Sequence, residues 1–274
     1  MESLNTDAAR EHRHKIINWR EQSWYPEPKR MRVYADLILL LTDPPRHRLR
    51  SLAIIADANG GKTVLMERLV AEHSRREGEE AQIIPVVMLS VTNIKRVEEL
   101  STKLLEQLGA PDPSRGTHVE RLKRFLDLAR KVGLRMIILD EFHDCVGAEG
   151  KGTPFLRLIK GLMNEQILVV PVGTPALVPI LKRDPQLASR FNFSRGTLGR
   201  LEDVGDIKAV MMHISRLPKE EVSNAAVQEV LEQTKGVFGH VLDLTEQTFL
   251  IYGDLKLDSL RRVRKTMDVL DDLI

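Results

Sequence analysis

The hydrophobic pattern of this chain changes near residue 200. Before that point, short apolar runs alternate with segments whose apolar residues recur at helical spacing. The runs predicted as strands are Leu52–Ala56, Gln82–Ser90, Arg135–Leu139 and Ile167–Val172. The helices predicted between them are Thr63–Arg76, Val97–Leu108, Thr117–Val132 and Phe155–Asn164. Continuous apolar strands with intervening helices are typical of a parallel sheet covered on both faces, so we expect an α/β core.

The two ends of the chain have a different character. An N-terminal helix is predicted over Lys29–Leu41, with one apolar face made of Met31, Tyr34, Leu37, Ile38 and Leu41. Trp19 and Trp24 precede it, which favours a docking segment over disorder. The helices predicted after Leu201 are Val204–Ile214, Ala225–Thr234, Val241–Ile251 and Leu257–Leu273. We therefore expect a docking segment and helix over 1–50, the core over 51–200, and a helical lid over 201–274.

The composition of the chain excludes several kinds of site and protein. Among 274 residues there is one cysteine, Cys145, so an internal disulfide framework and a multi-cysteine zinc site are excluded. We expect Cys145 to be a small buried residue. No apolar run approaches the roughly 20 residues that cross a bilayer, and the polar N-terminus is unlike a secretory signal. These features predict a cytoplasmic protein with no membrane partner. The net charge of +2 means that a nucleic-acid surface has to be local.

A phosphate-binding loop is predicted after the first strand. The order strand, glycine-containing turn, Gly-Lys-Thr and helix places backbone N–H groups around phosphate oxygens at a helix N-terminus. Lys62 would reach the terminal phosphates of ATP, and the Thr63 hydroxyl would bind Mg²⁺. Ala56 stands where the usual pattern has its first glycine, and an ordinary strand–helix turn is the alternative. The residues assigned to the nucleotide here are Asn59, Gly60, Gly61, Lys62, Thr63 and Val64.

A second buried strand ends in two carboxylates, Asp140 and Glu141. In a parallel sheet, ligands bind at the carboxyl ends of the strands. We assign Asp140 to the nucleotide site as a Mg²⁺ ligand and Glu141 to polarising the attacking water. The strand Gln82–Ser90 intervenes between the two motif strands, which fits the ATPase branch in which a strand separates them and Glu is catalytic. A solvated strand end is the alternative.

Two further residues are catalytic candidates. Thr174 follows the next strand and could hold the attacking water, although a helix N-cap with Pro175 at the first helical position explains Thr-Pro equally well. Arg190, followed by Phe191, resembles the arginine-finger segment of oligomeric AAA+ ATPases, in which an arginine supplied in trans stabilises charge on the transferring phosphoryl group. Arg195 and Arg200 are close rivals, and each of the three could instead form a surface ion pair.

These motifs together resemble the TniB family, the AAA+ ATPases of mercury-resistance-type transposons, which are related to TnsC regulators. The resemblance covers nearly the whole chain. It rests on the N-terminal Trp-and-Pro segment, Asn-Gly-Gly-Lys-Thr, Ile-Ile-Leu-Asp-Glu, Val-Gly-Thr-Pro and Ser-Arg-Phe. It implies an AAA+ P-loop NTPase, a three-layer α/β fold with a parallel sheet and a small all-α C-terminal lid. Many relatives of the broader class have a sensor arginine where this chain has His240.

The resemblance also implies partners. Subunits with ATP and Mg²⁺ would assemble as a ring or helical filament on double-stranded DNA, link a TniQ-like target selector to a DDE transposase, and disassemble on hydrolysis. By similarity to TnsC proteins, the DNA-binding residues would be Lys95, Arg96 and Thr117, in contacts that touch phosphates without reading bases. Thr117 also begins a capping box, and Lys95 and Arg96 could be a solvated helix start. The basic run Arg261–Lys265 is more typical of a solvated helical face.

Two other functions stay open at this point. A nucleotide-gated DNA scaffold with negligible turnover is compatible with Ala56 and His240. A P-loop small-molecule kinase is the third possibility, but we find no acceptor-binding insertion with clustered arginines, and a helical C-terminal lid fits AAA+ assembly better.

Overall fold

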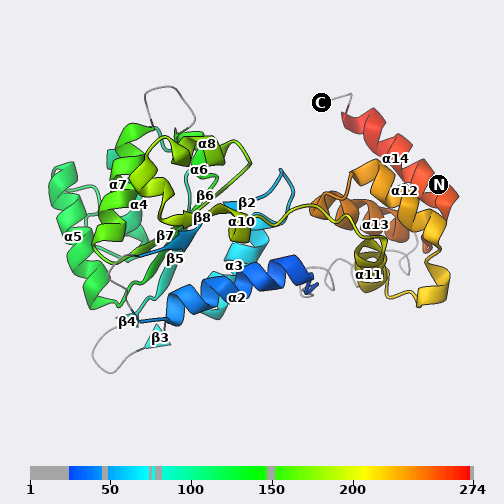
Figure 1. Ribbon diagram of the computed structural model, residues 1–274, viewed down its shortest axis with the longest axis horizontal. Coiled ribbons are helices and arrows are strands. Elements are labelled where there is room, and N and C mark those ends of the chain that lie inside the picture. Colours follow the sequence, from blue (N-terminus) through cyan, green and yellow to red (C-terminus); the bar gives the residue numbers. More distant parts are fainter. Residues whose placement is uncertain (1–24, 45–48, 74–75, 78–81, 147–151, 272–274) are drawn as a thin grey trace. The chain divides into compact units, whose positions relative to one another are not determined.

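The computed structural model describes residues 25–44, 49–73, 76–77, 82–146 and 152–271, with side chains except at 76–77 and 267–271. Trp19 and Trp24, assigned above to a docking segment, lie outside the described residues. The chain forms two compact units (Figure 1). One runs from Lys29 to Gly199, and the other runs from Arg200 onward and includes the described residues up to Pro28. The predicted N-terminal helix belongs to the first unit.

A parallel sheet forms the centre of the first unit. Its four-stranded part has the order β2 (Ile54–Ile55), β7 (Leu168–Gly173), β6 (Met136–Asp140) and β5 (Val86–Ser90). The predicted first strand is divided at Ala53, because β1 (Ser51–Leu52) pairs instead with β8 (Phe191–Asn192). All of these pairs are parallel. The carboxyl ends of β2, β7 and β6 therefore meet at one edge of the sheet.

The strand order corrects one expectation. β7, and not the strand Gln82–Ser90, separates the phosphate-loop strand from the acidic strand, while β5 pairs with the other edge of β6. Only Val86–Ser90 of that predicted run joins the main sheet; β4 (Gln82–Ile83) pairs antiparallel with β3 (Arg76–Glu77). Sequence order alone does not give spatial order, because each crossover helix can return the chain to either side of the preceding strand.

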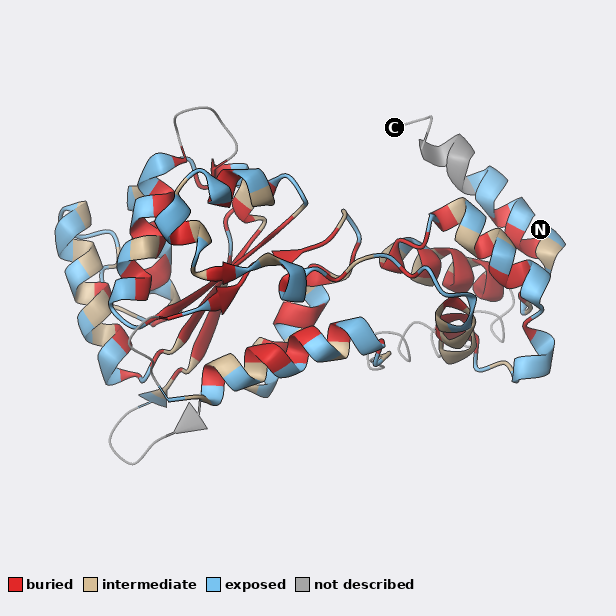
Figure 2. Ribbon diagram, in the orientation of Figure 1, coloured by how far each residue is buried: buried red, intermediate tan, exposed pale blue. Residues whose placement is uncertain are grey.

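Helices lie on both faces of the sheet, with α2 (Pro28–Thr42) and α3 (Lys62–Glu72) below it in Figure 1 and α7 (Thr153–Asn164) and α8 (Leu177–Lys182) above. β6 and β7 are buried along their whole length, as Figure 2 shows in red. The other helices of this unit are α4 (Val97–Gln107), α5 (His118–Lys131), α6 (Phe142–Val146), α9 (Pro185–Ala188) and α10 (Phe193–Gly196).

Helix α2 buries most of the face predicted for it, since Tyr34, Leu37 and Leu41 are buried while Met31 and Ile38 are half-buried. The buried surface also includes Val33 and two charged residues, Arg30 and Asp36. The two charged residues are buried because each has a partner in the fold. Arg30 donates to the Gly60 carbonyl, and Asp36 accepts from Arg195. An apolar-periodicity argument misses these two residues because it counts charged residues as solvent-facing.

The second unit is all-helical, as the pattern after residue 201 predicts. It contains α11 (Val204–Ser215), a 3₁₀ turn (Lys219–Glu221), α12 (Asn224–Thr234), α13 (Phe238–Tyr252) and α14 (Leu257–Asp271). Its own core includes Val210, Val227, Val241, Leu260 and Val263. Among the described residues of both units, no helix is long and apolar enough to cross a membrane.

Candidate nucleotide site

The phosphate loop is a tight turn between β2 and α3. Asn59 and Gly61 have φ angles of 56° and 78°, and α3 begins at Lys62. A Cβ on Gly60 would lie 2.6 Å from the Cβ of Ala56 and 2.8 Å from the Asp57 carbonyl oxygen. Gly60 therefore has to be glycine, and its missing side chain is what makes room for the methyl group of Ala56. The departure from the usual pattern at Ala56 is thus accommodated sterically.

The side chain of Lys62 lies inside this loop. Its Nζ donates to the carbonyl oxygens of Asp57 at 3.0 Å and of Ala56 at 3.3 Å, and the residue is only 4% exposed. A lysine so deeply buried requires polar partners, which the loop supplies. Val64, one residue further along the first turn of α3, is 57% exposed and presents an apolar side chain beside the loop.

The loop and the acidic strand end meet at Thr63 and Asp140. Thr63 Oγ1 donates to Asp140 Oδ2 at 2.7 Å, and Glu141 N donates to Asp140 Oδ1 at 3.0 Å. Asp140 is 3% exposed. Mg²⁺ takes oxygen ligands and binds through one or two carboxylates plus substrate phosphates. A hydroxyl and a carboxylate held in contact beside a phosphate loop fit this ion, and Thr63 and Asp140 are the residues that would hold it.

Glu141 has a strained backbone and a histidine neighbour. Its φ is 53°, a value that residues other than glycine seldom adopt and that is common at functional sites. Its Oε2 lies 3.3 Å from His143 Nδ1, while His143 Nε2 lies 3.5 Å from Asp144 Oδ1. The imidazole also packs against Gly173, where a Cβ would come within 2.9 Å of Nδ1. His143 thus places a polar ring between the Glu141 carboxylate and the end of β7.

Thr174 follows β7 directly and is half-buried. The alternative that it caps a helix with Pro175 at the first helical position is wrong, because α8 begins at Leu177 and its N-cap is Ala176, without a side-chain cap bond. The Thr174 carbonyl accepts from Leu177 N at 2.9 Å. Since β7 lies between β2 and β6, Thr174 leaves the sheet between the phosphate loop and the acidic pair.

The three candidate arginines have different environments. Arg190 Nη2 donates to Asn164 Oδ1 at 2.6 Å, and its backbone oxygen accepts from Ser51 N at 2.7 Å. Arg195 donates through Nε and Nη2 to both oxygens of Asp36. Arg200 is exposed at the start of the helical unit. Arg195 therefore has a structural partner within its own unit.

Arg190 lies far from the phosphate loop of its own chain. It comes just before β8, which runs parallel to β1 with Phe191 opposite Ser51, so it lies at the amino ends of these strands. The loop leaves the carboxyl end of β2, about five residues or roughly 16 Å further along. Arg190 lines a cavity of about 380 Å³ together with Arg50, Ser189 and Phe193. An arginine at this edge can act on a nucleotide only if that nucleotide belongs to another subunit.

The DNA candidates lie on two exposed loops. Lys95 and Arg96 follow β5; Lys95 N donates to Glu99 Oε2 at 3.0 Å and Arg96 Nε to Glu99 Oε1 at 3.0 Å. These bonds, the one from the Lys95 backbone first, lower the pKa of Glu99. Thr117 forms the capping box of α5 with Glu120. Its backbone N–H and then its hydroxyl donate to Glu120 and lower the pKa of that carboxyl.

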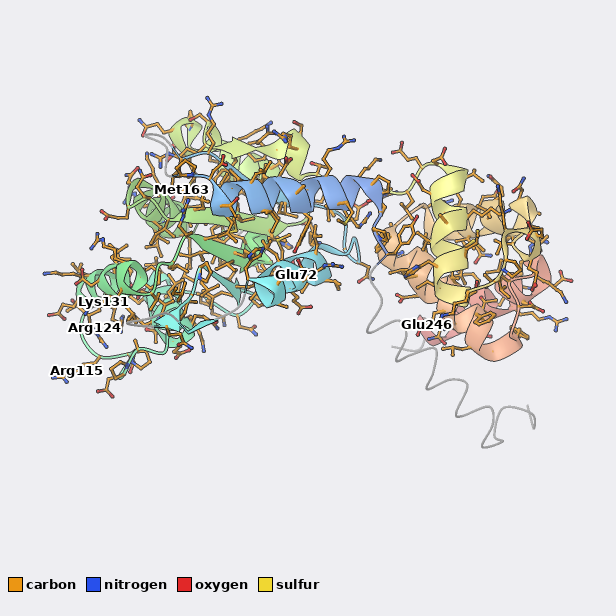
Figure 3. The ribbon with its side chains drawn as sticks, turned by 90° about the horizontal axis from the view of Figure 1, so that it is seen from below. Glu72, Arg115, Arg124, Lys131, Met163 and Glu246 are labelled. Carbon is orange, nitrogen blue, oxygen red and sulfur yellow. The ribbon has the colours of Figure 1, made fainter. Side chains whose placement is uncertain are left out.

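Other basic residues described by the structure have local roles. Arg121 donates to the Ser114 carbonyl, and Arg124 donates to the carbonyls of Pro111, Asp112 and Arg115, so α5 holds the loop before Thr117 in place. Figure 3 shows Arg115 and Arg124 at the same end of the unit. Val119, in the first turn of α5, is 74% exposed. In the C-terminal basic run, Arg261 pairs with Glu229.

Cys145 is buried, as expected for a structural cysteine. Burial, and to a smaller extent the Asp144 carboxylate, raises the pKa of its thiol to about 12. His143 and Arg30 were not identified from the sequence. His143 lies only two positions after Glu141, and Arg30 occupies the apolar stripe of a predicted helix. The position of Arg30 on that stripe could have identified it from the sequence, because a charged residue on a core-facing stripe has to be paired.

The parallel sheet, the phosphate loop and the contact between Thr63 and Asp140 define an AAA+ P-loop ATPase fold. Solved structures share it at low identity. The ORC2 protein of Aeropyrum pernix, in ADPNP and ADP complexes, has a TM-score of 0.64 at 14% identity, covering 90% of this chain and 70% of that one. The ORC1 protein of the same organism, in complex with DNA, has a TM-score of 0.60 at 13% identity, covering 89% and 65%.

A Walker-type ATPase of Pyrococcus abyssi is also similar, with a TM-score of 0.58 at 16% identity, covering 93% of this chain and 76% of that one. Identities this low establish the fold alone. The family model described as bacterial TniB protein matches residues 15–197. This chain therefore belongs to the TniB family. No curated protein matches its sequence.

Proposed function

We propose that this protein is an ATP-dependent, DNA-binding AAA+ regulator of DNA transposition that hydrolyses ATP. The observation that carries the proposal is its membership of the TniB family. The geometry of the nucleotide site supports the same function, since Lys62 and the Thr63–Asp140 pair lie together at one edge of the sheet. The DNA complex of the similar ORC1 protein is consistent with DNA binding by this fold.

In the proposed reaction, the amides of Gly61 and Lys62 and the Lys62 ammonium bind the phosphates of ATP, and Val64 packs beside the nucleotide. Mg²⁺, when bound, supplies positive charge that stabilises the negative charge developing on the phosphate oxygens. The Glu141 carboxylate accepts a hydrogen bond from the attacking water and orients it toward the γ-phosphate. Thr174, at the end of the strand between loop and acidic pair, holds that water from the other side.

Arg190 completes the site of a neighbouring subunit. Its place at the amino ends of β1 and β8 prevents it from reaching the phosphates of its own chain. Turnover consequently depends on assembly, because the transition-state charge is neutralised only when two subunits meet. On binding, Arg190 would exchange its hydrogen bond to Asn164 for one to the γ-phosphate.

Lys95, Arg96 and Thr117 are the proposed DNA contacts. Their loops are exposed, and contacts from such residues to phosphates would be tolerant of sequence and sensitive to salt. Arg96 is 75% exposed despite its pairing with Glu99, so a DNA phosphate can compete for it. The hydroxyl of Thr117 is committed to Glu120, which leaves Lys95 and Arg96 as the stronger candidates.

The proposed partners are duplex DNA, further copies of this chain in a ring or filament, a DDE transposase and a TniQ-like target selector. The test is electron microscopy of the purified protein with duplex DNA, with and without ADPNP. Nucleotide-dependent rings or filaments support the regulator, and dispersed monomers in both samples contradict it.

Glu141→Gln adds a second measurement to this test. With ATP, this variant should persist on DNA after the wild-type assemblies have dissociated, because hydrolysis drives release. Glu165→Gln, on an exposed carboxylate that pairs with Arg130, is the matched control and should behave like wild type. If assemblies form but wild-type protein and Glu141→Gln dissociate equally slowly, the protein is a nucleotide-gated scaffold with negligible turnover.

A further inference from the structure

Arg30 is the most deeply buried cation of α2. It is 1% exposed, and its Nη2 donates to the carbonyl oxygen of Gly60 at 2.8 Å. Gly60 belongs to the phosphate loop, 30 positions away in sequence. Burying a guanidinium is costly unless it is hydrogen-bonded or paired. The bond to Gly60 ties this buried cation to the geometry of the phosphate loop.

The bond to Gly60 sets the direction of one peptide group. The described chain contains no cis peptide bond, so the Gly60 carbonyl and the Gly61 N–H point in opposite directions from the same plane. With the carbonyl turned toward Arg30, the Gly61 N–H is turned away from α2. Gly61 also has a φ of 78° and caps α3, the position at which backbone donors bind phosphate.

Two other contacts hold α2 in place around this bond. One turn after Arg30, the Tyr34 hydroxyl donates to Glu72 at the end of α3, which Figure 3 labels. Half a turn further, Asp36 accepts from Arg195. The helix is thus anchored to α3 and to α10, so that Arg30 approaches the loop from a fixed support.

We infer that Arg30 is a positioning residue for nucleotide binding, which orients the Gly60–Gly61 peptide so that its N–H is presented to a phosphate. This inference rests on the proposed nucleotide site. It assigns a function to the N-terminal helix that is separate from the docking predicted for the segment before it. The side chain itself does not touch the nucleotide.

The test measures the affinity of the full chain for ADPNP with Mg²⁺ by calorimetry, together with the thermal midpoint of the protein without nucleotide. Arg30→Met should raise Kd about tenfold, the effect of losing a charge-assisted hydrogen bond that organises the site. The midpoint without nucleotide shows separately whether the variant is folded under the conditions of the binding measurement. Arg30→Gln, which is two bonds too short to reach Gly60, is the second variant if the first does not fold, and the same rise in Kd is expected.

Arg32→Met is the matched control, since it removes an exposed cation from the same helix and leaves the bond between Arg30 and Gly60 in place. Its Kd should equal that of wild type. If a folded Arg30 variant binds ADPNP as tightly as wild type, or if Arg32→Met weakens binding equally, Arg30 is not a positioning residue. Lys62→Ala separates this failure from that of the proposed function: if it too leaves Kd unchanged, the loop is not the nucleotide site.

Discussion

Thr63 and Asp140, 77 positions apart in sequence, are joined by a hydrogen bond of 2.7 Å from the Thr63 hydroxyl to the carboxylate. The bond connects the first turn of α3 with the end of β6, across the intervening β7. It brings together the two residues that the sequence assigns to Mg²⁺ from separate motifs. The carboxylate is buried and also accepts from Glu141 N, so both of its oxygens have fixed partners.

Asp140→Asn should weaken nucleotide binding only when Mg²⁺ is present. The amide keeps the size of the carboxylate but loses the charge that attracts the ion, so we expect Kd for ADPNP with Mg²⁺ to rise on the order of 10- to 100-fold. In EDTA, the variant and wild type should bind alike. Calorimetry under both conditions measures the difference. An equal loss with and without Mg²⁺ would indicate damage to the loop instead of a lost ion ligand.

Arg190→Ala should affect catalysis, whereas Arg195→Ala should affect stability. The first should abolish ATPase activity on DNA while leaving monomer Kd for ADPNP within about twofold, since Arg190 serves another subunit. The second should lower stability by about 1–3 kcal/mol, because it leaves the largely buried Asp36 without its ion pair. Steady-state ATPase assays and denaturant unfolding measure the two. A large loss of ADPNP binding in monomeric Arg190→Ala would contradict the assignment in trans.

Lys95→Ala should weaken DNA binding and flatten its salt dependence. Removing one phosphate contact per subunit reduces the slope of log K against log salt by about 1 for each contact. Fluorescence anisotropy with duplexes of unrelated sequence measures this slope. Lys103→Ala is the control, because Lys103 is exposed on α4 and pairs with Glu106. An unchanged slope in Lys95→Ala removes this residue from the DNA surface.

Gly236 and Gly253 form a matched pair in the helical unit. Both have a φ of 70°, but a Cβ on Gly236 would lie 2.0 Å from the Leu201 carbonyl oxygen, whereas a Cβ on Gly253 meets nothing within 4 Å. Gly253→Ala should cost about 1 kcal/mol, from backbone conformation alone. Gly236→Ala should cost roughly 3 kcal/mol or more, because the loop also has to move. Denaturant unfolding measures the loss of stability in each variant, and equal losses in the two variants would refute the steric argument.

Cys145 should react slowly with thiol reagents in the folded protein. With its pKa raised to about 12 by burial, only about 1 in 10⁴ molecules carries a thiolate at pH 8. Alkylation of the native protein should be on the order of 10³-fold slower than in guanidinium, and its rate should rise with pH throughout the range below 12. Since the chain has one cysteine, the signal has a single source. Comparable native and unfolded rates would show that the thiol is accessible.

The class of fold and the chemical parts of the site follow from the amino-acid sequence alone. Alternating strands and helices predicted the parallel sheet, and the order of glycines, Lys62 and Thr63 predicted the phosphate loop. The all-helical C-terminal part followed from the loss of strand patterns after residue 201. These features are local, because each depends on residues that lie within one or two elements of each other.

Which distant residues meet depends on the tertiary structure. The packed fold places β7, and not the strand Gln82–Ser90, between the two motif strands, and it pairs Arg195 with Asp36. It also directed Arg30 from the N-terminal helix to the Gly60 carbonyl. Strand order and the partners of buried charges depend on how the elements pack, and hydrophobic periodicity contains no record of that packing, because it reports which face of an element is buried but not against what.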